Sequence, residues 1–141
     1  VRGMNVDGGK VISLATPENG KNLLVVSEKG FGKMSPIADY RITNRGSKGV
    51  KTINVTEKTG ILVDIAAVDG NEELMVITKK GIIIRLNLNQ VKISGRNTQG
   101  VTLIKIKNNN FVASALSIET QYISQLAKNL FLSYFWSNSL R

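Results

Sequence analysis

Gly95-Arg96-Asn97-Thr98-Gln99-Gly100-Val101 is a glycine-flanked basic stretch that follows an apolar, strand-like segment. An earlier stretch, Asn44-Arg45-Gly46-Ser47-Lys48-Gly49-Val50, carries arginine, glycine and valine at the same positions, 51 residues upstream. Self-similarity at such a period is the signature of repeat architectures, in which each repeat is one supersecondary unit. The two stretches therefore predict a chain built from repeated units.

The same displacement relates longer segments on both sides of these loops. Leu23–Ser27 falls on Leu74–Thr78 when the chain is shifted by 51 residues. At a displacement of 50 residues, Phe111–Glu119 echoes Ile61–Asp69, which marks the start of a third unit. We therefore predict a repeat domain over residues 1–119, with two full repeats and a third beginning at 111, and a divergent segment over 120–141.

Each repeat is composed of short β-strand signals. Runs of about four to eight residues that are rich in Val, Ile and Leu and bounded by glycine turns are typical of strands. The runs are Leu23–Ser27, Ile61–Val68, Leu74–Thr78 and Ile82–Leu86. Four antiparallel strands in a unit of about 50 residues indicate an all-β, propeller-like blade. The alternative is an unrelated β-sandwich with a chance echo.

The charge balance points to a polyanionic partner. The 141 residues include 19 Lys and Arg against 10 Asp and Glu, a formal net charge of +9. Basic side chains that neutralise phosphates release counterions, so a basic globular domain is a candidate for nucleic-acid binding. The alternative is a basic surface that serves only solubility.

The residue types that are missing exclude several kinds of chemistry. The chain contains no histidine and no cysteine. Disulfides, imidazole or thiolate metal sites and Ser–His or Cys nucleophiles are therefore excluded, and we predict no catalytic residues and no metal site. The absence of cysteine favours a reducing, cytoplasmic location. No run approaches the roughly 18–20 apolar residues of a membrane span, so we expect no membrane partner.

The two basic loops and the segment Val26-Ser27-Glu28-Lys29-Gly30-Phe31-Gly32-Lys33 resemble the repeats of the C-terminal domain of DNA gyrase A. The resemblance runs in family order over residues 1 to about 119, and the matching domain of topoisomerase IV is the second candidate. It implies a β-pinwheel, a propeller-like ring in which neighbouring blades exchange a strand. Duplex DNA would wrap around its basic rim and support ATP-dependent negative supercoiling.

The resemblance also implies partners that the chain itself does not contain. These are double-stranded DNA, the rest of the gyrase A protein and the gyrase B protein; ATP, Mg²⁺ and the catalytic tyrosine of the family belong to other parts of the enzyme. The family's Gln-Arg-Arg-Gly-Gly-Lys-Gly run is absent, and Asn44–Gly49 is a degenerate relative of it. We therefore expect DNA binding without the full wrapping activity.

Arg45 and Arg96 are the leading candidates for DNA contact because they share one repeat position in a glycine-lined loop. An arginine fork can bind phosphate there, or it can tie down its own loop by bonding backbone carbonyls. The other candidates are basic residues near the loops, on strands or at hairpin tips: Arg41, Lys92, Lys48, Lys51, Lys33, Arg85, Lys29 and Lys80. Contacts of this kind tolerate any DNA sequence, since phosphates carry no base information.

The segment after Glu119 departs from the repeat. Aromatic and aliphatic pairs recur there every four residues, from Tyr122-Ile123 to Tyr134-Phe135, which predicts an amphipathic helix. We also expect that open blade edges allow two chains to associate. The rival function is a propeller-like protein-interaction scaffold without DNA binding, which scattered rather than continuous basic residues would favour.

Overall fold

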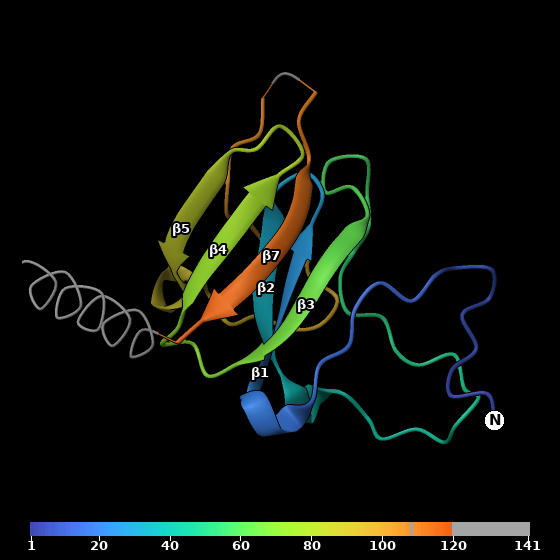
Figure 1. Ribbon diagram of the computed structural model, residues 1–141. Coiled ribbons are helices and arrows are strands. Elements are labelled where there is room, and N and C mark those ends of the chain that lie inside the picture. Colours follow the sequence, from blue (N-terminus) through green and yellow to red (C-terminus); the bar gives the residue numbers. More distant parts are fainter. Residues whose placement is uncertain (108, 120–141) are drawn as a thin grey trace, which may run out of the picture.

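Alternation of short apolar runs with glycine turns produces an all-β structure, as predicted (Figure 1). The computed structural model describes residues 1–107 and 109–119. Within them the strands are β1 (Asn22–Ser27), β2 (Phe31–Pro36), β3 (Leu62–Val68), β4 (Glu73–Thr78), β5 (Ile83–Asn87), β6 (Val101–Thr102) and β7 (Val112–Ile118). Three short 3-10 helices follow or precede strands: η1 (Pro17–Asn19), η2 (Ile37–Asp39) and η3 (Leu88–Gln90).

The first sheet contains strands from both repeats. Its order is β3-β1-β2-β6, and all of its pairs are antiparallel. The hairpin β1–β2 comes from the first repeat, whereas β3 and β6 come from the second. Asn22 lies opposite Val68 on one side of the hairpin, and Gly32 lies opposite Val101 on the other. Neighbouring repeats therefore exchange strands, and the sheet has the four strands predicted for a blade.

The second sheet repeats three of these four strands, in the order β5-β4-β7, and within the described residues it has no counterpart of β6. Strand β7 pairs with β4 as β3 pairs with β1, and both pairs shift register at the matching positions Val26/Ser27 and Ile77/Thr78. The equivalent strands β3 and β7 lie side by side where the two sheets meet (Figure 1). The two sheets are thus successive copies of one blade.

The hairpin tips of the two blades have the same turn. The amide N–H of Gly30 donates to the carbonyl oxygen of Ser27 (3.1 Å), and Gly81 donates to Thr78 in the same way (3.0 Å). Both glycines have φ near +80°, at 83° and 79°, a conformation that costs little only without a Cβ. The Lys-Gly pairs in the sequence therefore mark the ends of the hairpins.

The first apolar run of each repeat forms a strand only where it pairs with the hairpin of the preceding repeat, as β3 does with β1 and β7 with β4. Residues 11–15 have the same pattern as 62–66 but lie in no strand, and Val11 and Leu14 are 76% and 86% exposed. In the described part of the chain, no hairpin precedes this segment to pair with its backbone groups. Unpaired backbone groups stay in water, so the segment remains irregular.

The apolar core lies between the two blades. It is formed by buried residues of both sheets and of the segments that follow β5 and β6: Leu24, Val26, Met34, Val68, Leu74, Val76, Leu88, Val91, Ile104 and Val112. Each such side chain contributes about 1.5–3 kcal/mol when it is fully buried. One blade therefore depends on the next for its stability.

The helix predicted for 120–141 lies outside the described residues. Within residues 1–107 and 109–119, no helix has the length and apolar character required to cross a bilayer.

Candidate nucleic-acid interface

The loop that carries Arg96 is fastened to the outer side of β2 at both ends. At its start, the amide N–H of Ser94 donates to the carbonyl oxygen of Met34 (2.8 Å), and the hydroxyl of Ser35 donates to the carbonyl oxygen of Ser94 (2.7 Å). At its end, Val101 pairs with Gly32 in the ladder between β6 and β2. Residues 94–100, which we call the second basic loop, are therefore held against the first repeat.

The side chain of Lys33, on β2, is hydrogen-bonded to this loop. It is fully buried on β2, and its Nζ donates to the carbonyl oxygens of Gly95 (2.7 Å) and Arg96 and to Oγ1 of Thr98 (3.3 Å). Burial lowers the pKa of Lys33, and the positive charge of Arg96 lowers it further. A buried ammonium group is tolerated because these oxygens replace its water. Lys33 thus turns the loop carbonyls inward.

Arg96 is half-buried and connects the two repeats. Its Nη1 donates to the carbonyl oxygen of Lys51 (3.2 Å), and its guanidinium lies 5.6 Å from the ring centroid of Tyr40. The hydroxyl groups of Tyr40 and Thr52 are hydrogen-bonded to each other. The guanidinium has five N–H donors in a fixed fork, so one bond to a carbonyl leaves capacity for a phosphate. Arg96 therefore bonds a backbone carbonyl, as the second alternative from the sequence had it, but the carbonyl belongs to a neighbouring segment and not to its own loop. Its contact with DNA stays a prediction.

Arg45 occupies the same repeat position in residues 44–49, the first basic loop, but its side chain is exposed. This loop packs on the N-terminal segment through the N–H of Gly46 on the carbonyl oxygen of Gly3 (2.9 Å). Lys48 forms an exposed ion pair with Asp7 (2.8 Å). The first loop therefore presents Arg45 to solvent with fewer constraints than the second loop places on Arg96.

Similar backbone bonds attach each basic loop to the segment beside it. Asn5 donates its N–H to the carbonyl oxygen of Ser47 (2.9 Å), and Asn54 donates to Thr98 (3.4 Å). The exposed Lys51 lies between the two loops in sequence, and its Nζ donates to Oδ1 of Asn54 (3.2 Å). The structure thus brings Lys51 and Arg96 together.

The remaining predicted residues are spread over the molecule. Arg41 and Lys92 are exposed in the segments that lead into the two loops. Arg85 lies on β5 in an ion pair with Glu73, and the hydrogen bond to this carboxylate raises the pKa of Arg85. Lys29 and Lys80 lie in the turns of the hairpins β1–β2 and β4–β5. The predicted set is therefore divided between the two basic loops, the β5 surface and the hairpin tips.

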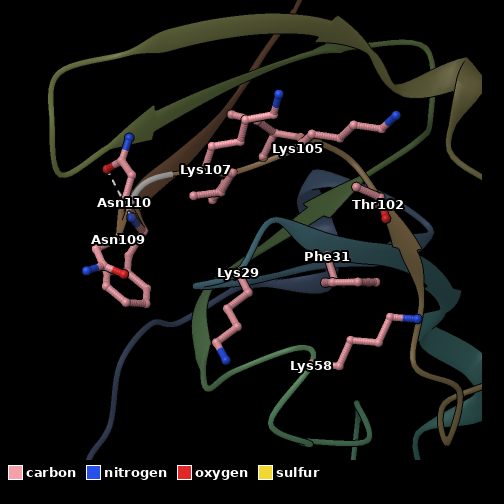
Figure 2. Close-up of a pocket in the computed structure, with 11 residues that line it drawn as sticks. Lys29, Phe31, Lys58, Thr102, Lys105, Lys107, Asn109 and Asn110 are labelled. Carbon is pink, nitrogen blue, oxygen red and sulfur yellow. Dashed lines mark hydrogen bonds between the residues drawn. The ribbon is translucent and has the colours of Figure 1, made fainter.

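A groove at the hairpin-tip end contains three lysines outside the set predicted from the sequence. It has a volume of about 480 Å³ and is lined by Lys58, Lys105 and Lys107 together with Lys29 (Figure 2). The positions equivalent to Lys105 and Lys107 in the first repeat are Asn54 and Thr56, so the repeat comparison gave no signal for them. The alternation Lys-Ile-Lys over 105–107 is the one sequence signal that could have indicated two exposed lysines on either side of a partly buried residue.

A sequence profile of the family described as "DNA gyrase C-terminal domain, beta-propeller" matches residues 21–69 and 72–119. The chain belongs to this family. Each matched segment contains one hairpin and the strand that pairs with it from the next repeat: β1, β2 and β3 in the first segment, and β4, β5 and β7 in the second. The gyrase-type β-pinwheel anticipated from the basic loops is thereby confirmed.

Individual relatives agree with the family. The DNA gyrase A protein of Deinococcus deserti is 48% identical over 114 residues, and that of Staphylococcus epidermidis ATCC 12228 is 40% identical over 124 residues. These matches cover 79% and 86% of this chain but only 14% of each relative. The chain thus spans a small part of the length of the gyrase proteins it matches.

Solved structures share the fold. A DNA gyrase A C-terminal domain superposes with a TM-score of 0.67 at 25% identity, covering 70% of this chain and 34% of that domain. The C-terminal domain of a DNA topoisomerase IV superposes with a TM-score of 0.64 at 23% identity, covering 74% of this chain and 32% of that one. The second likeness concerns the fold alone.

Proposed function

We propose that this chain is a DNA-binding module of a type IIA topoisomerase, namely part of the C-terminal domain of a DNA gyrase A protein. The observation that carries the proposal is the pair of basic loops at one repeat position in a chain of the gyrase C-terminal family, the second of which is fastened to a strand-exchanged blade. Arg45 and Arg96 are its central residues, and Lys48 and Lys51 extend the basic surface beside them.

The proposed mechanism is electrostatic capture of duplex DNA. Arg45 is free of the packing that holds Arg96, whereas Arg96 is oriented by Tyr40 and Lys51. A fixed guanidinium loses less side-chain entropy when it binds a phosphate, and a mobile one can follow the path of the backbone. Smooth bending of 20–30 base pairs costs of order 1–6 kcal/mol, which several phosphate contacts offset. In the complete enzyme this bending would contribute to DNA wrapping along a basic rim.

The proposal assigns the chemistry to other parts of the enzyme. In the cytoplasm, the rest of the gyrase A protein and the gyrase B protein would supply strand cleavage, ATP hydrolysis and Mg²⁺ for negative supercoiling. This chain would position DNA for them and perform no chemical step. Association of two chains through open blade edges stays a separate prediction.

The first test asks whether the chain binds duplex DNA regardless of the base sequence. The chain is titrated against two unrelated fluorescent duplexes of about 40 base pairs at low salt, where phosphate contacts are strongest. We expect similar dissociation constants for the two duplexes and weaker binding by Arg45→Ala/Arg96→Ala. The matched control is Lys10→Ala/Lys21→Ala, which removes the same charge from exposed positions outside the two loops.

Two results would overturn the proposal. If the folded wild-type chain binds neither duplex, the protein-interaction scaffold becomes the better account. If the loop variant and the control lose the same affinity, binding depends on net charge and the loops are not the interface.

A further inference from the structure

The groove at the hairpin-tip end is lined almost entirely by cationic, amide and apolar side chains. Figure 2 shows Lys105 and Lys107 on one side of it and Lys29 and Lys58 on the other. Its remaining residues include Phe31, Phe111 and the amides of 109 and 110, and none of its eleven lining residues is acidic. A concave surface of this composition favours a negatively charged ligand.

The fold fixes the direction of the two lysines that the first repeat lacks. Ile106 packs against the core between the blades, while Lys105 and Lys107 on either side of it are exposed. Because Ile106 packs against the core, the side chains of Lys105 and Lys107 are exposed at the groove. Their ammonium groups are therefore available for a ligand that lies along this end of the blades.

Aromatic rings hold two further lysines at the same end. Nζ of Lys58 lies 5.5 Å from the ring centroid of Phe31, and Nζ of Lys79 lies 5.5 Å from that of Phe111. Cation–π contacts of this kind at exposed sites are worth about 0.5–1 kcal/mol. They restrict the lysine side chains, so that less entropy is lost when a phosphate binds.

The opposite end of the blades has the opposite charge. A second groove, of about 470 Å³, lies beside the ends of β3 and β7 and includes four carboxylates: Glu18, Asp69, Glu72 and Glu119. None of its lining residues is basic. The six residues of β1 separate the two ends by about 20 Å, which is more than the Debye length of about 8 Å at physiological salt. A polyanion is therefore attracted to one end of the blades and repelled by the other.

We propose that the groove formed by Lys29, Lys58, Lys105 and Lys107 binds phosphate groups of the DNA backbone, so that the duplex crosses the blades at the hairpin-tip end. This inference rests on the proposed function and adds the face over which the DNA lies. Thr102 of β6 lines the groove, and the second basic loop directly precedes β6. The loop and the groove are thus joined by one short segment and can contact one continuous backbone.

A charge-matched pair of variants tests the groove. The full chain carrying Lys105→Ala/Lys107→Ala is compared with the control Lys10→Ala/Lys21→Ala, in which Lys21 lies at the acidic end of β1. Binding to the duplex is measured over a salt series. Each lost phosphate contact makes the slope of log K against log salt shallower by about 0.9, so we expect a change of about 2 for the groove variant. The control should change much less, and Lys105→Arg/Lys107→Arg should retain the wild-type slope.

The outcomes separate this inference from the proposed function. Equal slopes for the groove variant and the control, with intact wild-type binding, would overturn the groove and leave the basic loops as the interface. If the wild-type chain binds no duplex, calorimetric titration with tripolyphosphate shows whether the groove is a phosphate site. Binding of tripolyphosphate that is lost in the groove variant would keep a phosphate site without DNA, and no binding would overturn the groove as well. Circular dichroism melting verifies that each variant is folded.

Discussion

Nζ of Lys33 lies 2.7 Å from the carbonyl oxygen of Gly95, in a loop that belongs to the next repeat. The lysine side chain is fully buried, and its Nζ also donates to the carbonyl oxygen of Arg96. A strand of one blade thus determines the shape of the basic loop contributed by the following repeat. Strand exchange therefore couples the stability of the blades to the geometry of the candidate interface.

Replacement of Lys33 by methionine should affect both stability and binding. Lys33→Met keeps the apolar stem but leaves the inward-facing carbonyls of Gly95 and Arg96 without their donor. A buried polar group left unsatisfied costs about 1–3 kcal/mol, so the free energy of unfolding should fall by that amount. Urea denaturation measures it, with the exposed Lys21→Met as the control. An unchanged unfolding free energy would show that the ammonium group does not hold the loop.

The buried ammonium also predicts a dependence of stability on pH. Burial lowers the pKa of folded Lys33 below 10.5, its ordinary value, and Arg96 adds to the effect. Between these two pKa values the unfolded chain binds more protons at this site, so the free energy of unfolding rises with pH there. The unfolding free energy of the wild type relative to Lys33→Met should therefore increase as the pH approaches 10.5. A difference that stays flat or decreases would contradict the lowered pKa.

The two equivalent arginines should respond differently to substitution. Arg45 is exposed, whereas Arg96 bonds the carbonyl oxygen of Lys51 and lies over Tyr40. Arg45→Ala should weaken DNA binding and leave the melting temperature unchanged. Arg96→Ala should weaken binding and also reduce the free energy of unfolding by about 1 kcal/mol, from the lost hydrogen bond and cation–π contact. Equal effects of the two variants on stability would contradict the packing seen at Arg96.

Two glycines test the exchanged edge between β2 and β6. Gly100 and Gly81 both have left-handed φ angles, at 81° and 79°, and alanine at either should cost about 1–2 kcal/mol. A Cβ at Gly100 would also lie 2.6 Å from the carbonyl oxygen of Gly32, whereas none of the described atoms lies within 4 Å of a Cβ at Gly81. Gly100→Ala should therefore destabilise the chain clearly more than Gly81→Ala in thermal melts. Similar melting temperatures would argue against the close approach of the two strands.

The repeat made most strands predictable. The runs Ile61–Val68 and Leu74–Thr78 differ by one residue from β3 and β4, because apolar runs between glycine turns determine both. Residues 11–15 have the same signal without a strand, since pairing depends on a neighbouring repeat that local sequence does not contain. Sequence periodicity therefore locates the strands, and the neighbouring chain segments decide which of them form.

The candidate interface was less predictable than the fold. Arg45 and Arg96 stand out because they repeat, but the burial of Lys33 has no counterpart, since its equivalent in the second repeat is Ile84. Lys105 and Lys107 also lack repeated counterparts, and only the path of the chain between β6 and β7 brings them to Lys29. A comparison of one repeat with another does not predict side chains whose burial or position depends on contacts between repeats.

The salt dependence of duplex binding by the wild-type chain shows whether the basic loops bind DNA phosphates. The basic surface of Arg45, Lys48, Lys51 and Arg96 corresponds to about four phosphate contacts, which gives a slope of log K against log salt of about −3.5 or steeper. We expect this slope for the wild-type chain, and a slope shallower by about 2 for Arg45→Ala/Arg96→Ala. A slope near zero, or no binding by the folded chain at low salt, would contradict the assignment of this chain as a DNA-binding module.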